Sequence, residues 1–272
     1  MGDRRHDVPR EFFLGGRDLE MRVIRELIER RRAGTVHDRN LAWGARTGDY
    51  RDEIEQALES GHEAVLIELT DDVGFEGRSG VIVVDHHGPR AGRDVPTALG
   101  QVFTLVGGKP DEWTRELALV AANDRGHTRA MRAMGATIDE MRRIRAMDRE
   151  AQGITPEEER AGREAAELRE ELGDGRLTIV RLPHGRVATV TDVLERDLGG
   201  PGYENLVIFS PEQTLFFGDG EKIERLREKF PGGWWGGELP ERGYWGRGGR
   251  VNDDVLISEL MFNGSNTNSE AK

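Results

Sequence analysis

The 272 residues of this chain suffice for two domains of ordinary size or for one large domain, and they carry a formal net charge of −12 without any cysteine. The missing cysteines exclude disulfides, thiolate metal ligands and cysteine nucleophiles, and the negative charge argues against a protein that coats long nucleic acids. No stretch reaches the roughly 18 consecutive apolar residues of a membrane span, and the N-terminus lacks the apolar core of a signal peptide, so we expect a cytoplasmic protein without a membrane partner.

Predicted strands and helices alternate in the first half of the chain. Residues 11–14 form an apolar run before two glycines, and apolar residues at helical spacing follow from 19 to 32. Apolar runs next to glycine predict buried strands, and helical patterns fill most of the intervening sequence; the strands are 64–69 and 80–84, and the helices 50–60, 96–105 and 111–122. Such alternation predicts an α/β domain, a parallel sheet covered by helices on both faces.

The second half predicts a smaller α/β domain joined to the first by a helical linker. A helix is expected over 138–149, followed by a helix from 156 to about 172 that consists almost entirely of Glu, Arg and Ala. So polar a helix is typical of a solvated bridge between domains. Four strands should follow, at 177–182, 187–190, 205–209 and 214–217, and then a helix at 221–230. The expected boundaries are 1–153 for the first domain, 154–174 for the linker, 175–262 for the second domain and 263–272 for a disordered tail.

One strand ends in metal-ligand side chains. The four β-branched residues 81–84 lead directly into Asp85, His86 and His87. Ligands collect at the carboxyl ends of parallel strands, and carboxylate and imidazole together suit a hard or borderline metal ion. The bland alternative is a strand followed by a polar turn with solvated histidines. We interpret the pattern as the edge of an active site.

Other carboxylates stand at comparable places, each with an ordinary alternative. Asp18 and Glu20 follow the first strand, where they could simply stabilise a helix N-terminus. Glu68 lies in an apolar strand, and a buried, unpaired carboxylate is too unfavourable to be left without a cation or donor. Asp124 follows a predicted helix, in a sequence that is also a common turn signal. The order of the set along the chain favours a shared site.

This set of residues resembles the DHH phosphoesterase superfamily over most of the chain. In that family, motifs at successive strand ends hold one or two metal ions, commonly manganese. The resemblance implies a site for one or two Mn²⁺ ions, with Mg²⁺ as an alternative. Its implied ligands are Asp18, Glu20, Glu68, Asp85, His86 and Asp124, of which Asp85 would either bind the metal or orient the other ligands. It also implies that His87 faces the phosphate. In the mechanism that we expect, Arg125 would assist His87 in catalysis.

The sequence departs from the family pattern at identifiable places. Glu20 replaces the second aspartate of the first motif, and no histidine precedes Asp18. His37 could supply the missing imidazole, although an exposed loop histidine is the simpler interpretation. Asp71 and Asp72 are possible substitutes for the carboxylate of the second motif.

A glycine-rich segment over 230–250 matches the substrate-gripping part of the family's C-terminal domain, although it lacks the family's histidine. By resemblance, the backbone of Gly236 and Gly237 would receive a phosphate. Arg242, Arg247 and Arg250 are available to contact it, and the sequence does not choose among them. The aromatic residues of the segment could stack on a base; these are Trp234, Trp235, Tyr244 and Trp245. Segments of glycine and aromatic residues also form ordinary packed loops.

These patterns predict a metal-dependent phosphohydrolase, a phosphodiesterase that cleaves a phosphoester or phosphoanhydride in a small nucleotide-like substrate held in a cleft between two domains. The alternative is a catalytically impaired, nucleotide-binding regulatory protein on the same scaffold. An exonuclease acting on long single strands is disfavoured by the net charge. The expected partner is therefore a small phosphorylated or nucleotide substrate, and the protein could form a homodimer.

Overall fold

A computed structural model describes residues 8–87, 90, 92 and 94–262. The chain divides into two compact units, Met1–Gly153 and Ile154–Lys272. The tail that we expected to be disordered, 263–272, lies outside the described residues. None of the helices within the described ranges is long and apolar enough to cross a membrane.

The first unit is built on a parallel sheet. Its strands are β1 (Arg10–Leu14), β2 (Thr35–His37), β3 (Glu63–Ile67) and β4 (Val81–Val84), in the order β2-β1-β3-β4. Phe13 of β1 lies opposite Leu66 of β3, which in turn lies opposite Val83 of β4. All described pairings in this sheet are parallel, so the carboxyl ends of the strands lie at one edge.

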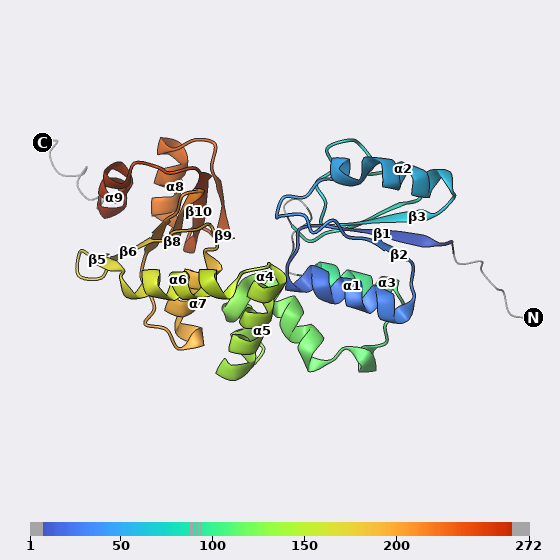
Figure 1. The fold of residues 1–272 in the computed structure, drawn as a ribbon, viewed down its shortest axis with the longest axis horizontal. Helices are drawn as coiled ribbons and strands as arrows, with labels where there is room; N and C mark the ends of the chain where they lie inside the picture. The colour runs from blue at the N-terminus through green and yellow to red at the C-terminus, as the bar shows by residue number, and fades with distance from the viewer. Residues whose placement is uncertain (1–7, 88–89, 91, 93, 263–272) are drawn as a thin grey trace, which may run out of the picture. The chain divides into compact units, whose positions relative to one another are not determined.

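Helices cover both faces of this sheet, as the sequence predicted (Figure 1). The helices of the unit are α1 (Leu19–Arg31), α2 (Arg51–Glu59), α3 (Ala98–Leu105), α4 (Arg115–Ala133) and α5 (Ile138–Ala151), with short 3-10 turns at Thr47–Tyr50 and Pro110–Glu112. On one face, Ile54 and Ala57 of α2 pack in a core with Phe13 and Leu66. The helices α1 and α3 lie on the opposite face.

The second unit is a mixed sheet with helices on both faces. Its strands are β5 (Glu170–Leu172), β6 (Leu177–Arg181), β7 (Leu206–Phe209), β8 (Gln213–Asp219), β9 (Trp234–Glu238) and β10 (Arg242–Gly248), in the order β5-β6-β7-β8-β10-β9. Only the β6–β7 pairing is parallel among those described. Its helices are α6 (Pro156–Glu167), α7 (Ala188–Leu194), α8 (Gly220–Lys229) and α9 (Asp253–Met261), with a 3-10 turn at Arg196–Leu198. One core packs under α8 and α9, and a second packs under α6 and α7.

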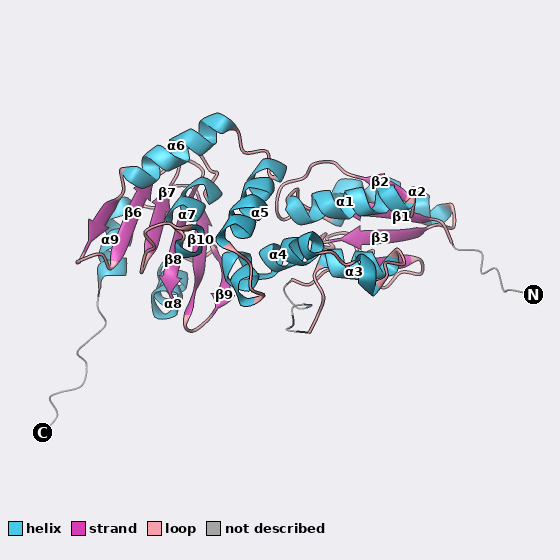
Figure 2. Ribbon diagram, turned by 90° about the horizontal axis from the view of Figure 1, so that it is seen from below, coloured by secondary structure: helices cyan, strands magenta, loops and turns pink. Residues whose placement is uncertain are grey.

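The polar helix expected from 156 to about 172 is not a solvated linker. The helix α6 ends at Glu167 and runs alongside β6 within the second unit (Figure 2). Its Ala165 and Ala166 are buried in the core that contains Val180 and Val190. A stripe of small residues is therefore enough to dock a helix whose other positions are charged.

The strand expected at 187–190 is instead the helix α7. Its β-branched residues favour strands locally, but Val190 and Leu194, four residues apart, point into the same core. The helix α6 approaches closely at Gly162, where an added Cβ would lie 2.1 Å from Thr189 Oγ1. Tertiary packing thus overrides the local propensity.

Candidate metal centre

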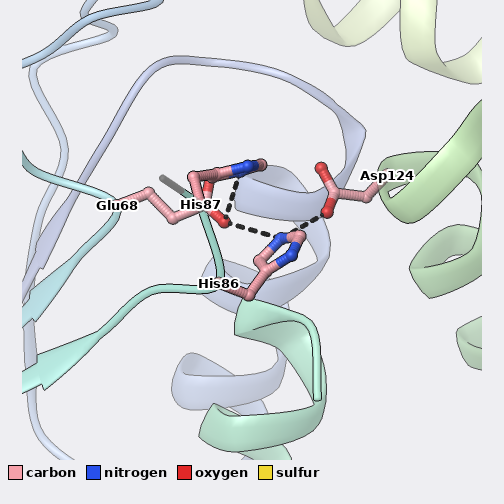
Figure 3. A group of neighbouring side chains, drawn as sticks. All are labelled: Glu68, His86, His87 and Asp124. Carbon is pink, nitrogen blue, oxygen red and sulfur yellow. Dashed lines mark ion pairs between the residues drawn. The ribbon is translucent and has the colours of Figure 1, made fainter. Parts of the chain in front are cut away.

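Four side chains from three elements converge at the carboxyl edge of the parallel sheet (Figure 3). Glu68 directly follows β3, His86 and His87 come shortly after β4, and Asp124 belongs to α4. Each contributes one ligand atom to a group in which all four atoms lie within 4.8 Å of one another. The structure brings His87 Nε2 to 3.2 Å from Glu68 Oε1, and the predicted place of His87 at the phosphate stays a prediction. In the sequence, the feature that pointed to His87 was its position next to His86, directly after a predicted strand.

His86 is the centre of the group. Its Nε2 lies 2.7 Å from Asp124 Oδ2 and 3.1 Å from Glu68 Oε1. Glu20 Oε2 lies 4.0 Å from the same nitrogen. All four of these atoms are buried, and their close polar contacts are the ion pairs that they make with one another. Buried polar atoms rarely stay unpaired, and these oxygen and nitrogen donors suit a divalent cation.

The pKa values at the site show how strongly its charges interact. Burial raises the pKa of Glu68, but the contacts with His86 and His87 outweigh it and lower that pKa to about 2. Burial likewise opposes the charged form of His86, yet Asp124 and Glu68 raise its pKa to about 10. Burial, reinforced by Asp124 and Glu68, raises the pKa of Glu20 well above its usual range. A cation at this point would take over the role of the imidazolium charge.

The backbone at Glu68 is held in an unusual conformation. Its φ is +50°, in the left-handed region that side chains other than glycine seldom adopt. The Glu68 amide still donates to Val84 O at 2.9 Å, so the residue stays anchored to β4 while the chain turns. On its other side lies Gly15, where an added Cβ would be 2.7 Å from Glu68 O and 2.8 Å from Ile67 O. Only a glycine lets the end of β1 approach this closely.

Replacing Gly15 with alanine is therefore expected to displace Glu68. Overpacking of this kind lowers the free energy of unfolding by about 1 to 3 kcal/mol, and a shifted ligand weakens metal affinity by about 10- to 100-fold. Calorimetric titration with Mn²⁺ and thermal unfolding would measure both effects. Gly248→Ala is the matched control, because an added Cβ there meets no atom within 4 Å. Unchanged Mn²⁺ affinity in Gly15→Ala would contradict the prediction.

The two carboxylates of the first motif have different surroundings. Asp18 is the N-cap of α1, where its Oδ1 accepts from Met21 N at 2.8 Å. Burial, offset by that hydrogen bond and reinforced mainly by Asp124, raises its pKa to about 7. Glu20 Oε1 accepts from Leu99 N at 3.1 Å, which leaves Oε2 towards His86. Asp18 lies outside the group of four, so its role as a ligand stays a prediction.

Asp85 holds the histidine segment rather than joining the group of four. Its Oδ1 accepts from His87 N at 2.8 Å, and its Oδ2 lies 3.2 Å from Arg90 Nη1. Arg125, proposed as a catalytic residue, is exposed and donates to Val95 O. Its catalytic role stays a prediction.

The suggested substitutes have other partners. Asp71 accepts from the backbone amides of 74–76, and the Thr47 hydroxyl donates to Asp71 at 2.9 Å. Asp72 accepts from Gly48 N at 2.8 Å. His37 Nε2 lies 2.7 Å from Glu11 Oε2 and its ring stacks on Phe13. These side chains organise loops and the sheet instead of completing the group.

The glycine-rich segment forms a hairpin rather than a turn. Gly236 and Gly237 of β9 pair with Tyr244 and Gly243 of β10. Arg242 and Arg247 stand five residues apart on β10, so their side chains leave the strand on opposite faces. These four binding roles stay predictions.

The aromatic residues of this hairpin differ in their availability. Trp245 lies fully buried in the core of the second unit and cannot stack on a base. Trp235 is 46% exposed, but the guanidinium carbon of Arg227 lies 3.8 Å from its ring centroid. The expected platform of stacking residues is thus partly used for packing.

No protein-family profile and no curated protein matches the chain. Solved structures do. An exopolyphosphatase-related protein from Bacteroides fragilis matches with a TM-score of 0.54 and 10% identity, over 93% of this chain and 90% of that one. The pGpG-specific phosphodiesterase PggH from Vibrio cholerae matches with a TM-score of 0.46 and 12% identity, over 93% of this chain and 97% of that one.

RecJ from Thermus thermophilus, in complex with Mn²⁺, matches with a TM-score of 0.47 and 13% identity, over 94% of this chain and 52% of RecJ. The chain therefore spans about half the length of RecJ. Identities this low show a shared fold, and the Bacteroides protein carries that comparison with its higher TM-score. The chain therefore shares the fold of the exopolyphosphatase-related protein, a fold of two α/β units as its sequence predicted.

Proposed function

We propose that the protein is a metal-dependent phosphohydrolase, a phosphodiesterase that cleaves a phosphoester or phosphoanhydride in a small nucleotide-like substrate. The observation that supports this most is the convergence of Glu68, His86, His87 and Asp124 at the carboxyl ends of the strands, where ligands collect, with ligand atoms of three of them buried against one another. Parallel sheets, buried carboxylates and imidazoles also occur apart from one another. Carboxylates and imidazoles gathered at the carboxyl ends of parallel strands are what support a phosphohydrolase as the function.

Glu68, His86 and Asp124 would hold the ion, with Glu20 close enough to join them after a small movement. A bound Mn²⁺ or Mg²⁺ would polarise a phosphoryl oxygen and lower the pKa of a bound water. The low pKa of Glu68 keeps that carboxylate ionised and ready to bind at neutral pH.

His87 is suited to a role at the substrate. Its side chain is 52% exposed, whereas those of His86 and Glu68 are 8% and 12% exposed. Asp85 fixes its backbone amide, and Glu68 raises the pKa of its imidazole through their direct contact. A protonated imidazole at this position would stabilise charge on a phosphate or donate to the leaving oxygen.

The test is a panel of pyrophosphate, mononucleotides, linear dinucleotides and cyclic dinucleotides, each assayed with Mn²⁺, with Mg²⁺ and with EDTA. We expect hydrolysis of at least one substrate that depends on the metal and disappears with EDTA. The wild-type chain and Glu68→Gln would be compared, since the variant keeps the shape of the side chain and removes its charge. Metal-independent release of phosphate, equal in both proteins, would refute the proposal.

A regulatory protein is the second candidate, and one observation favours it. The carboxylate of Asp18 caps a helix and lies outside the group of four, so a second metal position has fewer ligands. Tight nucleotide binding in the presence of Mn²⁺ without turnover would support this candidate over the hydrolase.

A further inference from the structure

A buried ion pair lies on α5, outside the candidate metal group. Arg145 and Asp148 are 1% and 4% exposed, and Arg145 Nη1 lies 2.7 Å from Asp148 Oδ2. Gln152 Nε2 donates to the same carboxylate oxygen at 3.1 Å. Replacing a buried ion pair with apolar residues often leaves a protein as stable or more stable, so fold stability alone gives little reason for this pair.

The pair is hydrogen-bonded to two other segments of the chain. Arg145 Nη1 donates to Asn123 Oδ1 at 3.0 Å, and Asn123 is itself buried directly before Asp124. Asp148 Oδ1 accepts a hydrogen bond from Leu19 N at 3.1 Å. Leu19 is the residue between Asp18 and Glu20. Leu19 N is one of the helix-start amides that have no partner inside their own helix. One ion pair therefore connects the segment of Asp124 to the segment of Glu20.

The helix that carries Asp124 needs such an anchor. Two residues beyond Asp124 its helical conformation is interrupted, with φ −169° and ψ 32° at Gly126 and φ 51° and ψ −144° at His127. The regular helical segment that contains Asn123 and Asp124 therefore ends at this kink. The side chain of Asn123, held by Arg145, fixes the end of the regular segment instead.

We propose that Arg145 and Asp148 are positioning residues that set the distance between Asp124 and the start of α1, and thereby the affinity of the site for its metal ion. The proposal rests on the metal site of the proposed function but not on hydrolysis itself. Residues that orient metal ligands typically change metal affinity by about 10- to 100-fold when they are removed.

The experiment is a calorimetric titration of the full chain with Mn²⁺. Arg145→Met keeps the length of the side chain and removes both the charge and the donors to Asn123 and Asp148. Asp148→Asn keeps the shape and weakens the contact with Leu19 N. We expect both variants to bind Mn²⁺ about 10- to 100-fold more weakly and to regain most of their kcat at saturating Mn²⁺.

Arg143→Met is the matched control. Arg143 lies on the same helix, its side chain is 48% exposed, and it pairs with Glu116, whose side chain is 53% exposed. Exposed pairs contribute little, so this variant should keep the wild-type affinity. Arg145→Lys should fall between wild type and Arg145→Met, because lysine keeps the charge but not the planar fork.

Each outcome decides something. Wild-type Mn²⁺ affinity in a folded Arg145→Met would overturn the positioning role, as would an equal loss in Arg143→Met. If Arg145→Met does not fold, Asn123→Ala carries the test, since it removes only the connection to Asp124; unchanged affinity there would likewise overturn the proposal. A wild-type chain that binds Mn²⁺ without hydrolysing any substrate would refute the proposed function alone. A wild-type chain that binds no Mn²⁺ would refute both.

Discussion

His86→Ala is expected to lower Mn²⁺-stimulated hydrolysis by about 10³-fold. Oxygens of three carboxylates lie 2.7 to 4.0 Å from the imidazole Nε2 of His86. A metal ion supplies several kcal/mol to catalysis, and each 1.4 kcal/mol corresponds to about tenfold in rate. The measurement is kcat/KM for the best substrate of the panel at a fixed Mn²⁺ concentration, together with the Mn²⁺ dissociation constant.

The matched control for this prediction is His62→Ala. His62 belongs to the same unit, but its Nδ1 pairs with Glu11 of β1, at 2.7 Å, near the amino ends of the strands. This variant should keep its activity within a few-fold of wild type. If His86→Ala retained full activity, His86 and the metal centre built around it would have no part in the reaction.

Sequence patterns predict the first unit better than the second. The continuous apolar run at 64–67 belongs to β3, a central strand of the parallel sheet, because strands that are buried on both faces leave a simple signature in the sequence. The run at 81–84 forms β4, which is paired on one side only among the described strands. The short edge strand β2 at Thr35–His37 was expected as part of a loop. Its burial pattern is mostly intermediate, so the sequence carries little apolar signal.

The errors in the second unit share one physical cause. The helix at 188–194 packs Val190 and Leu194 into a core with residues of α6 and β6, and it meets α6 closely at Gly162, 27 positions before Thr189. The hairpin of β9 and β10 likewise pairs glycines whose local preference is for turns. Local propensity does not include contacts between residues that are far apart in the sequence, and such contacts determine the secondary structure here.

In the candidate site, too, some residues could be predicted from the sequence and others could not. Residues at strand ends could be predicted because a parallel sheet brings its carboxyl ends together, and Glu68 and His86 lie there as expected. The pair Arg145 and Asp148 was not predicted, since an amphipathic helix rich in Arg and Asp normally directs these residues to solvent. Only the packed structure shows that they are buried.

Binding of Mn²⁺ is expected to release a proton from His86 and to strengthen as the pH rises. The pKa of His86 is raised to about 10 by Asp124 and Glu68 against the effect of burial, so the imidazole is protonated at neutral pH when no metal is bound. A metal ligand must be the neutral imidazole, and each pH unit below that pKa therefore weakens binding about tenfold. From about pH 6 to about pH 8 the affinity should rise about 100-fold. Titrations in two buffers with different ionisation enthalpies would count the released protons.

The raised pKa of His86 also determines how the stabilisation of the fold by the metal changes with pH. A histidine whose pKa is raised in the folded state stabilises that state fully below its ordinary value of 6.5, and this stabilisation is lost as the pH rises through about 10. The bound metal replaces the lost contribution, because a ligand that binds only the folded state stabilises it in proportion to the logarithm of concentration over Kd. The rise in melting temperature on adding Mn²⁺ should thus grow over the same pH range in the wild type and in His62→Ala, and much less in His86→Ala. A pH-independent rise, without proton release, would mean that the ion binds away from His86.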